Sequence, residues 1–311
     1  YAEALPLSRR ALAIVENAQG PEHADTGIYL NNLALLYKSM GQTAEALPLY
    51  RRALAITEKA QGAEHPDTGI RLNNLAELYR AVGLYADALP LYQRALAITE
   101  KARGAEHPET GVRLNNFAAL YVSMGQYAEA LPLYRRALAI AVKTEGPQHP
   151  STAGSLNNLA LLFEFLGQNA AALPLYQRAL AIREKVQGAG HPETGVSLNN
   201  LAALHASMGL YTEALPLSRR ALAIAEQAQG SEHPETGGRL NNLAFQYAAI
   251  GQYGEALPLF RRALLIANNS ESPELAWNVL NNLRTVHVRE KQPGLAIYFG
   301  KQAVNTLQGM R

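Results

Sequence analysis

Six of the eight histidines recur at the same interval of 42 residues. They are His23, His65, His107, His149, His191 and His233. A row of imidazoles suggests a metal site, but two rings on one zinc ion need nitrogens within about 2.1 Å of the metal. Equivalent residues of stacked helical units lie at least about 8–10 Å apart. We therefore expect each ring to pack in a loop or to satisfy a helix end, and we predict no metal site. We expect the remaining two, His205 and His287, to be half-buried packing residues.

A column of arginines keeps the same interval and could hold phosphates. It comprises Arg10, Arg52, Arg94, Arg136, Arg178, Arg220 and Arg262. These residues share their predicted helices with glutamates such as Glu58 and Glu100, and the net charge of the 311-residue chain is only +2. We therefore expect a solvated outer face with local ion pairs, and no nucleic-acid partner.

No motif for catalysis stands out in the sequence. A phosphate-binding glycine loop, paired catalytic carboxylates and a nucleophile motif are all missing, so we predict no enzyme and no cofactor. The chain has no cysteine, which excludes disulfides and thiolate chemistry within it and favours a reducing compartment. No apolar run reaches the ~18–20 residues of a membrane span. We expect a cytoplasmic monomer with no membrane partner.

The elements that position these residues follow from a repeat, which is marked by pairs of asparagines. Six pairs begin at Asn31, Asn73, Asn115, Asn157, Asn199 and Asn241, each 42 residues after the one before. A seventh pair, Asn281-Asn282, follows after 40 residues. A fixed period of this length predicts an array of identical helical units, each packed on its neighbours.

Residues 66–107 show what one unit forms. Pro66 suits the first position of a helix. An apolar stripe at i, i+3, i+4 and i+7 then follows, at Leu72, Leu75, Ala76 and Tyr79. We predict one helix at about 66–82 and a second at about 85–102, separated by Gly83 as a left-handed cap. Pro90 lies inside the second helix, where we expect a slight bend. No period-two alternation suggests a strand, so the fold class is all-α.

The pattern Asn-Leu-Ala-x-Leu-Tyr-x-x-x-Gly-x-Tyr-x-x-Ala-Leu resembles the tetratricopeptide repeat. The phrases at 48–56 and 62–68 look like the 42-residue repeats of kinesin light chains and their bacterial relatives. The resemblance implies a right-handed superhelical solenoid of antiparallel helix pairs that binds a peptide or protein segment without catalysis. We expect a single solenoid over 1–311. Residues 1–20 would be the second helix of a truncated repeat, 21–270 six 42-residue repeats, and 271–311 a divergent terminal unit.

The last unit departs from the others, with Arg284 at a position that is otherwise alanine and Lys291 in place of the turn glycine. A terminal cap is one interpretation, since end repeats are commonly atypical. The stretch 296–305 also looks like the segment before the caspase-like CHAT protease domain of some bacterial repeat proteins. That resemblance implies a sensor or regulatory array with a protease domain beyond Arg311, and the start of the chain in mid-unit suggests a piece of a longer protein. A self-assembling structural scaffold is a third possibility.

In the tetratricopeptide family, the first helix of each unit lines a concave groove that holds extended peptides. The resemblance therefore implies a groove ladder made of the first asparagine of each pair: Asn31, Asn73, Asn115, Asn157, Asn199, Asn241 and Asn281. An asparagine amide both donates to and accepts from a peptide backbone. We expect the second asparagine of each pair to make a structural bond at the helix junction.

Selectivity should come from positions on the same face that vary between units. Four residues after the ladder come Leu35, Glu77, Ala119, Leu161, Ala203 and Phe245. Seven residues after it come Lys38, Arg80, Val122, Glu164, Ala206 and Ala248. We predict a groove with a charged end in the first units and a more apolar end in the later ones.

Overall fold

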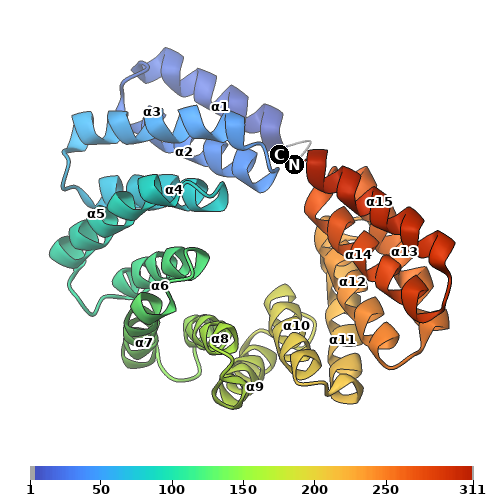
Figure 1. The fold of residues 1–311 in the computed structure, drawn as a ribbon. Helices are drawn as coiled ribbons and strands as arrows, with labels where there is room; N and C mark the ends of the chain where they lie inside the picture. Colours follow the sequence, from blue (N-terminus) through green and yellow to red (C-terminus); the bar gives the residue numbers. More distant parts are fainter. Residues whose placement is uncertain (1–3, 310–311) are drawn as a thin grey trace. The chain divides into compact units, whose positions relative to one another are not determined.

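A computed structural model describes residues 4–309, and all of its regular structure in this range is α-helical (Figure 1). The first helices of the repeats, here called A helices, are α2 (Ala24–Ser39), α4 (Pro66–Ala81), α6 (Pro108–Ser123), α8 (Pro150–Phe165), α10 (Pro192–Ser207), α12 (Pro234–Ala249) and α14 (Pro273–Arg289). The second or B helices are α1 (Ala4–Gln19), α3 (Thr43–Gln61), α5 (Tyr85–Arg103), α7 (Tyr127–Thr144), α9 (Asn169–Val186), α11 (Tyr211–Gln229), α13 (Tyr253–Asn269) and α15 (Pro293–Gly309). The ends of the predicted first and last units, 1–3 and 310–311, lie outside the described residues.

The chain divides into two compact units, Tyr1–Leu162 and Phe163–Arg311. Within each unit, an A helix packs on the B helix that follows it and also on the B helix that precedes it. Figure 1 shows this for α2, α3 and α4 in the first unit and for α12, α13 and α14 in the second. Neighbouring A helices also touch, as α4 does α6 and α10 does α12. The predicted all-α class of antiparallel helix pairs is confirmed, whereas the extent of a single domain stays a prediction.

Histidine determines where most A helices begin. Nδ1 of His65 accepts a hydrogen bond from the backbone N–H of Asp67 at 3.2 Å, and Pro66 occupies the first helical position. The same cap occurs at His23, His107, His191 and His233, and His149 makes it with Ser151 at 3.3 Å. A cap of this kind satisfies one of the donors that every helix leaves free at its start. The expectation that the histidine column serves helix ends is confirmed.

Small and aromatic residues share the core between the two helix types. Ala76 of α4 and Ala88 of α5 are fully buried, so the two helices approach closely, and Tyr92 is 1% exposed beside them. The B helices from α3 to α13 each contain an interior proline, as predicted at Pro90, and the helix continues through it. Gly83 adopts a φ of 77° after α4, as expected for a left-handed cap. The predicted helix boundaries of this unit are correct to within one residue.

The arginine column forms ion pairs between successive B helices. Arg94 Nη1 lies 2.6 Å from Glu58 Oε1, and its Nη2 donates to the backbone carbonyl of Ala63 at 2.7 Å. Equivalent pairs join Arg52 to Glu16, Arg136 to Glu100, Arg220 to Glu184 and Arg262 to Glu226. The expectation of an outer face with local ion pairs is confirmed.

Two further expectations concern the last repeat and the packing histidines. Lys291 replaces the turn glycine and adopts a φ of 57°, which a non-glycine residue rarely does. His287 is 4% exposed and stacks on Phe299 at 5.3 Å, so it is fully rather than half buried. No described helix is long and apolar enough to cross a bilayer.

Candidate functional site: the A-helix face

The A-helix face is defined here as the surface formed by the partly exposed side chains of the A helices. In α4 it carries Ile70, Asn74, Glu77 and Arg80, whose helical spacing places them on one face, whereas Asn73 is buried. The helix caps of the histidine column and the ion pairs of the B helices lie elsewhere on each repeat. Glu77 and Arg80, which differ from their equivalents in other repeats, lie on this face.

At least one member of each asparagine pair joins a ladder that links one repeat to the next. Nδ2 of Asn74 donates to Oδ1 of Asn31 at 2.9 Å, and Nδ2 of Asn116 donates to Oδ1 of Asn73 at 3.1 Å. The ladder continues from Asn158 to Asn115 at 3.4 Å, from Asn242 to Asn199 at 3.1 Å and from Asn282 to Asn241 at 3.0 Å. The structural bond predicted for the second asparagine is confirmed, and its acceptor is the first asparagine of the preceding repeat.

The ladder uses carboxamide groups of the first asparagines that were expected to bind a ligand. Asn31, Asn73 and Asn157 are at most 5% exposed, whereas Asn115, Asn199, Asn241 and Asn281 are half-buried. Asn115 also donates to the hydroxyl of Ser155 at 3.2 Å, and Asn281 donates to the carbonyl of Trp277 at 3.0 Å. Contact of the seven first asparagines with a peptide stays a prediction, and the half-buried ones are the accessible candidates.

The charged selectivity positions of the first unit pair with their neighbours. Lys38 Nζ lies 2.8 Å from Glu77 Oε1 on the adjacent A helix. Arg80 donates to the hydroxyl of Ser123 at 3.3 Å. Leu35 is 50% exposed beside them. A ligand would therefore meet a face whose charges are largely balanced, with an apolar side chain at its edge.

The remaining predicted positions offer apolar contacts and one carboxyl group. Ala119 and Val122 are half-buried on α6, and Leu161 is exposed on α8. Glu164 accepts a hydrogen bond from the hydroxyl of Tyr176 at 3.2 Å. Burial raises the pKa of the Glu164 carboxyl, and the Tyr176 bond opposes that rise.

In the second unit, the A-helix face contains a cavity of about 410 Å³. Its walls are Ala203, Ala206 and Ser207 of α10, Tyr211 at the start of α11, and Asn242, Phe245 and Gln246 of α12. The ring of Phe245 is 45% exposed and meets the ring of Tyr211 edge-on at 6.5 Å. Cavities of this size with mostly apolar walls and a few polar groups are typical of binding sites. Three of the predicted apolar-end positions, Ala203, Ala206 and Phe245, thus line one cavity.

One residue in the cavity wall, Gln246, has a buried acceptor and was not among the predicted site residues. Gln246 is 2% exposed, and its Nε2 donates to the hydroxyl of Ser218 at 2.8 Å. Its Oε1 is buried and has no hydrogen-bond partner within residues 4–309. The sequence does contain a sign of this exception. The position of Gln246 is leucine in the five preceding units. The position of Ser218 is tyrosine in the four preceding full units. A polar pair that replaces an apolar pair in one repeat marks a specialised repeat.

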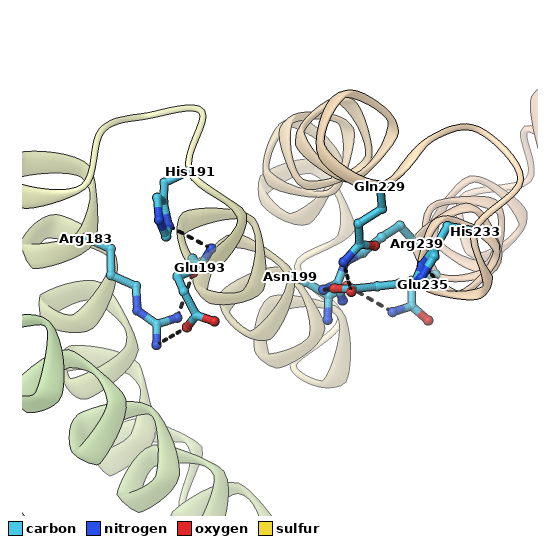
Figure 2. Close-up of polar contacts among 9 residues, drawn as sticks. Arg183, His191, Glu193, Asn199, Gln229, His233, Glu235 and Arg239 are labelled. Atoms are coloured by element: carbon cyan, nitrogen blue, oxygen red, sulfur yellow. Dashed lines mark hydrogen bonds and ion pairs between the residues drawn. The ribbon is translucent and has the colours of Figure 1, made fainter. Parts of the chain in front are cut away.

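Two arginines with little exposed surface pair with glutamates at the starts of α10 and α12 (Figure 2). Arg239 Nη2 lies 2.6 Å from Glu235 Oε1, and Gln229 donates to Glu235 Oε2 at 2.5 Å. One repeat earlier, Arg183 of α9 reaches Glu193 Oε2 at 2.8 Å. Burial lowers the pKa of both guanidinium groups, and the paired carboxylates oppose that shift. Arg71 and Arg113 hold the position of Arg239 in earlier repeats and show the same pKa direction for the same reason.

Several solved structures are similar to this chain. One is a crystal structure of nearly identical TPR-like repeats of a putative kinesin light chain from Podosopora anserina. It is 31% identical, covers 67% of this chain and 99% of its own, and has a TM-score of 0.55. BtubC (BKLC) from P. vanneervenii is 24% identical over 76% of this chain and 92% of its own, with a TM-score of 0.59. A Rap protein complexed with Competence and Sporulation Factor is 14% identical over 99% of both chains, with a TM-score of 0.58.

Family profiles agree with these structures. No curated protein matches the chain significantly. One tetratricopeptide repeat profile matches residues 1–59, 33–101, 67–141, 113–185, 151–227 and 193–237, and a second matches 236–270. These matches cover most of the chain. The chain therefore belongs to the tetratricopeptide repeat family.

Proposed function

We propose that the chain is a protein-interaction module that binds an extended peptide or partner segment on its A-helix face. The cavity of about 410 Å³ beside Phe245 is the observation that carries this proposal. It lies at variable positions of an otherwise uniform repeat, and its exposed aromatic ring is a feature of a contact surface. A Rap protein that shares the fold is complexed with Competence and Sporulation Factor.

The chemistry of the face supports binding rather than catalysis. The described residues contain no group of three or more histidine, cysteine, aspartate and glutamate side chains that could hold a metal ion. The titratable groups of the face are either paired with each other, as Lys38 and Glu77 are, or bonded to a hydroxyl, as Glu164 is. A protease domain beyond Arg311 and self-assembly stay predictions.

A display library of random extended peptides tests the proposal. We expect the wild-type chain to enrich a family of peptides whose affinity falls at least tenfold in Phe245→Glu, because a carboxylate would enter the apolar cavity. Leu265→Glu is the matched control, since Leu265 is 56% exposed on the B helix α13, away from the A-helix face. Circular dichroism would verify that both variants fold.

Two results would contradict the proposal. One is a wild-type chain that enriches no peptide family over successive rounds of selection. The other is a set of enriched peptides that bind Phe245→Glu and Leu265→Glu equally well, which would place the contact outside the cavity.

A further inference from the structure

A guanidinium group occupies the same space in several repeats, and this space is here called the guanidinium socket. In the second unit its walls are Gly195 of α10, Ala221 and Ala225 of α11, and Glu235 and Arg239 of α12. The Arg239 side chain, only 13% exposed, fills the space so well that a cavity of about 10 Å³ is left. Figure 2 shows Arg239 beside Glu235 and Gln229 in this filled socket.

A second repeat fills its socket from another helix. Position 197 is serine rather than arginine, and Arg183 of the preceding B helix supplies the guanidinium (Figure 2). Nη1 of Arg183 donates to the backbone carbonyl of Glu193 at 2.6 Å and to the hydroxyl of Ser197 at 3.1 Å. A serine at this position is therefore compatible with a guanidinium that arrives from outside its own helix.

The socket between α6 and α8 has neither arginine. Ser155 stands at the position of Arg239, and Ala141 stands at the position of Arg183. A cavity of about 260 Å³ is present here, against about 10 Å³ in the filled equivalent. Seven of its twelve lining residues correspond to those of the filled socket at an offset of 84 positions, among them Gly111, Ala137, Ala141 and Ser155. The cavity also extends beyond the socket, to Val112, Asn115 and Asn158.

This open socket nevertheless keeps a carboxylate. The acidic residue at the start of the A helix is replaced by Ser151, but Glu145 lines the cavity at the position that Gln229 holds in the filled socket. Its Oε1 accepts a hydrogen bond from the Ser151 hydroxyl at 3.2 Å. Its one ion pair among the described residues is with His149 Nδ1 at 3.4 Å. The Glu145 side chain is 25% exposed at the edge of the cavity, and no ion pair joins it to an arginine or lysine among the described residues.

The polar groups around this cavity are mainly acceptors. Besides Glu145, the Ser155 hydroxyl accepts one hydrogen bond from Asn115 and its oxygen can accept a second. Asn158 can accept at Oδ1 because its Nδ2 is bonded to Asn115. A guanidinium is planar and carries five donors and no acceptor, so it suits several acceptors at once. Ala137, Ala141 and Val112 provide apolar surface for the aliphatic part of an arginine side chain.

We propose that the open socket between α6 and α8 binds an arginine side chain of a partner segment. The inference rests on the proposed binding of a peptide by the A-helix face, and it adds the chemistry that one repeat selects. The incoming arginine takes the place that Arg239 and Arg183 take in their own repeats, and it pairs with Glu145 as they pair with Glu235 and Glu193. An uncharged or apolar occupant is the alternative that the experiment below tests.

The experiment uses three blocked peptides that differ at one position within an alanine-glycine background: arginine, its neutral isostere citrulline, and lysine. Methyl NMR of the full chain follows Ala137 and Ala141, whose methyl groups line the socket. We expect saturable shifts of these methyls with the arginine peptide and at least tenfold weaker binding of the citrulline peptide. Lysine should bind more weakly than arginine, because one ammonium cannot reach several acceptors with a fixed fork.

Two variants connect the signal to the socket. Ser155→Arg places an internal guanidinium where Arg239 has one, so it should fold and should abolish the shifts caused by the arginine peptide. Glu145→Gln copies the filled repeats at this position and should weaken binding at least tenfold. Equal binding of arginine and citrulline peptides, or unchanged binding to Ser155→Arg, would overturn the proposal.

The two proposals fail separately. If the peptides selected from the library depend on Phe245 but the arginine peptide shifts neither Ala137 nor Ala141, the socket proposal is wrong and peptide binding by the second unit stands. If the library gives no enriched family while the arginine peptide shifts both methyls and Ser155→Arg removes the shifts, the socket stands without the Phe245 cavity.

Discussion

Asparagines of neighbouring pairs form one carboxamide bond at five of the contacts between repeats. Asn73 is 2% exposed and accepts from Asn116 at 3.1 Å. Asn73→Ala would leave the Asn116 amide without this acceptor, and an unpaired amide at a partly buried site costs about 1–3 kcal/mol. We expect the free energy of unfolding to fall by an amount near the lower end of this range, because Asn116 is half-buried and water can reach it. Urea unfolding of the variant measures the change.

Asn32 provides the matched control for this prediction. It is the second asparagine of the first pair and is exposed, so Asn32→Ala should change the free energy of unfolding by less than about 0.5 kcal/mol. The double variant Asn73→Ala/Asn116→Ala should cost less than the sum of its single variants, since only one bond is lost. Additive costs would show that the two carboxamides do not interact.

At the scale of single residues, the sequence predicted the roles of residues that recur in every repeat better than the roles of residues that differ between repeats. The cap at His65 and the structural bond of Asn74 followed from position in a helical unit. The bond partner of Asn74 did not, because the pairing of Asn74 with Asn31 depends on the offset between neighbouring helices. Gln246 and Ser155 were missed for another reason: each is one polar residue within a repeated pattern, and its effect depends on which larger side chain is missing opposite it.

At the scale of helices, glycines in the A helices have two different surroundings. A Cβ on Gly195 of α10 would lie 3.0 Å from Cγ2 of Ile224 on the B helix α11, which is closer than ordinary contact. A Cβ on Gly238 of α12 would meet no atom within 4 Å. We expect Gly238→Ala to raise the free energy of unfolding by about 0.5–1 kcal/mol, because alanine is the better helix former.

Gly195→Ala should have the opposite sign. The gain in helix propensity is the same, but overpacking against the branched side chain of Ile224 costs about 1–3 kcal/mol. Thermal unfolding of the two variants, which carry the same substitution in equivalent helices, compares them directly. A stabilised Gly195→Ala would show that α10 and α11 separate easily, and that glycine is not required for their close approach.

The bounds of the helices were predictable because each repeat has strong local signals at both ends. Pro66 and Gly83 gave the limits of α4, and the 42-residue period carried these limits along the chain. The last repeat lacks the turn glycine, yet Lys291 adopts the same left-handed conformation. Packing of α14 on α15 imposes the turn there against the preference of the residue.

At the scale of the whole molecule, repeat number and order were predictable from the period alone, whereas the cavities were not. A cavity forms where the side chains of two or three helices fail to fill the space between them. The opening at Ser155 thus depends on Ala141 of another helix as much as on Ser155. The 42-residue period identifies each repeat, but only the packing of neighbouring helices shows which repeat lacks a side chain that fills the space between them.

Because each repeat contacts mainly its neighbours, a local defect should act locally. Asn73→Ala breaks the bond between α4 and α6, so we expect backbone amides of these helices to exchange about fivefold faster, which corresponds to about 1 kcal/mol. Amides of α12 to α14 should exchange at the wild-type rate. Asn241→Ala is the mirror-image control, because it removes the acceptor of Asn282 and should accelerate exchange in α12 and α14 instead. Hydrogen exchange with mass spectrometry resolves these segments. The same increase in exchange throughout residues 4–309 in both variants would show that the array unfolds as one cooperative body, and that nearest-neighbour contacts do not set its local stability.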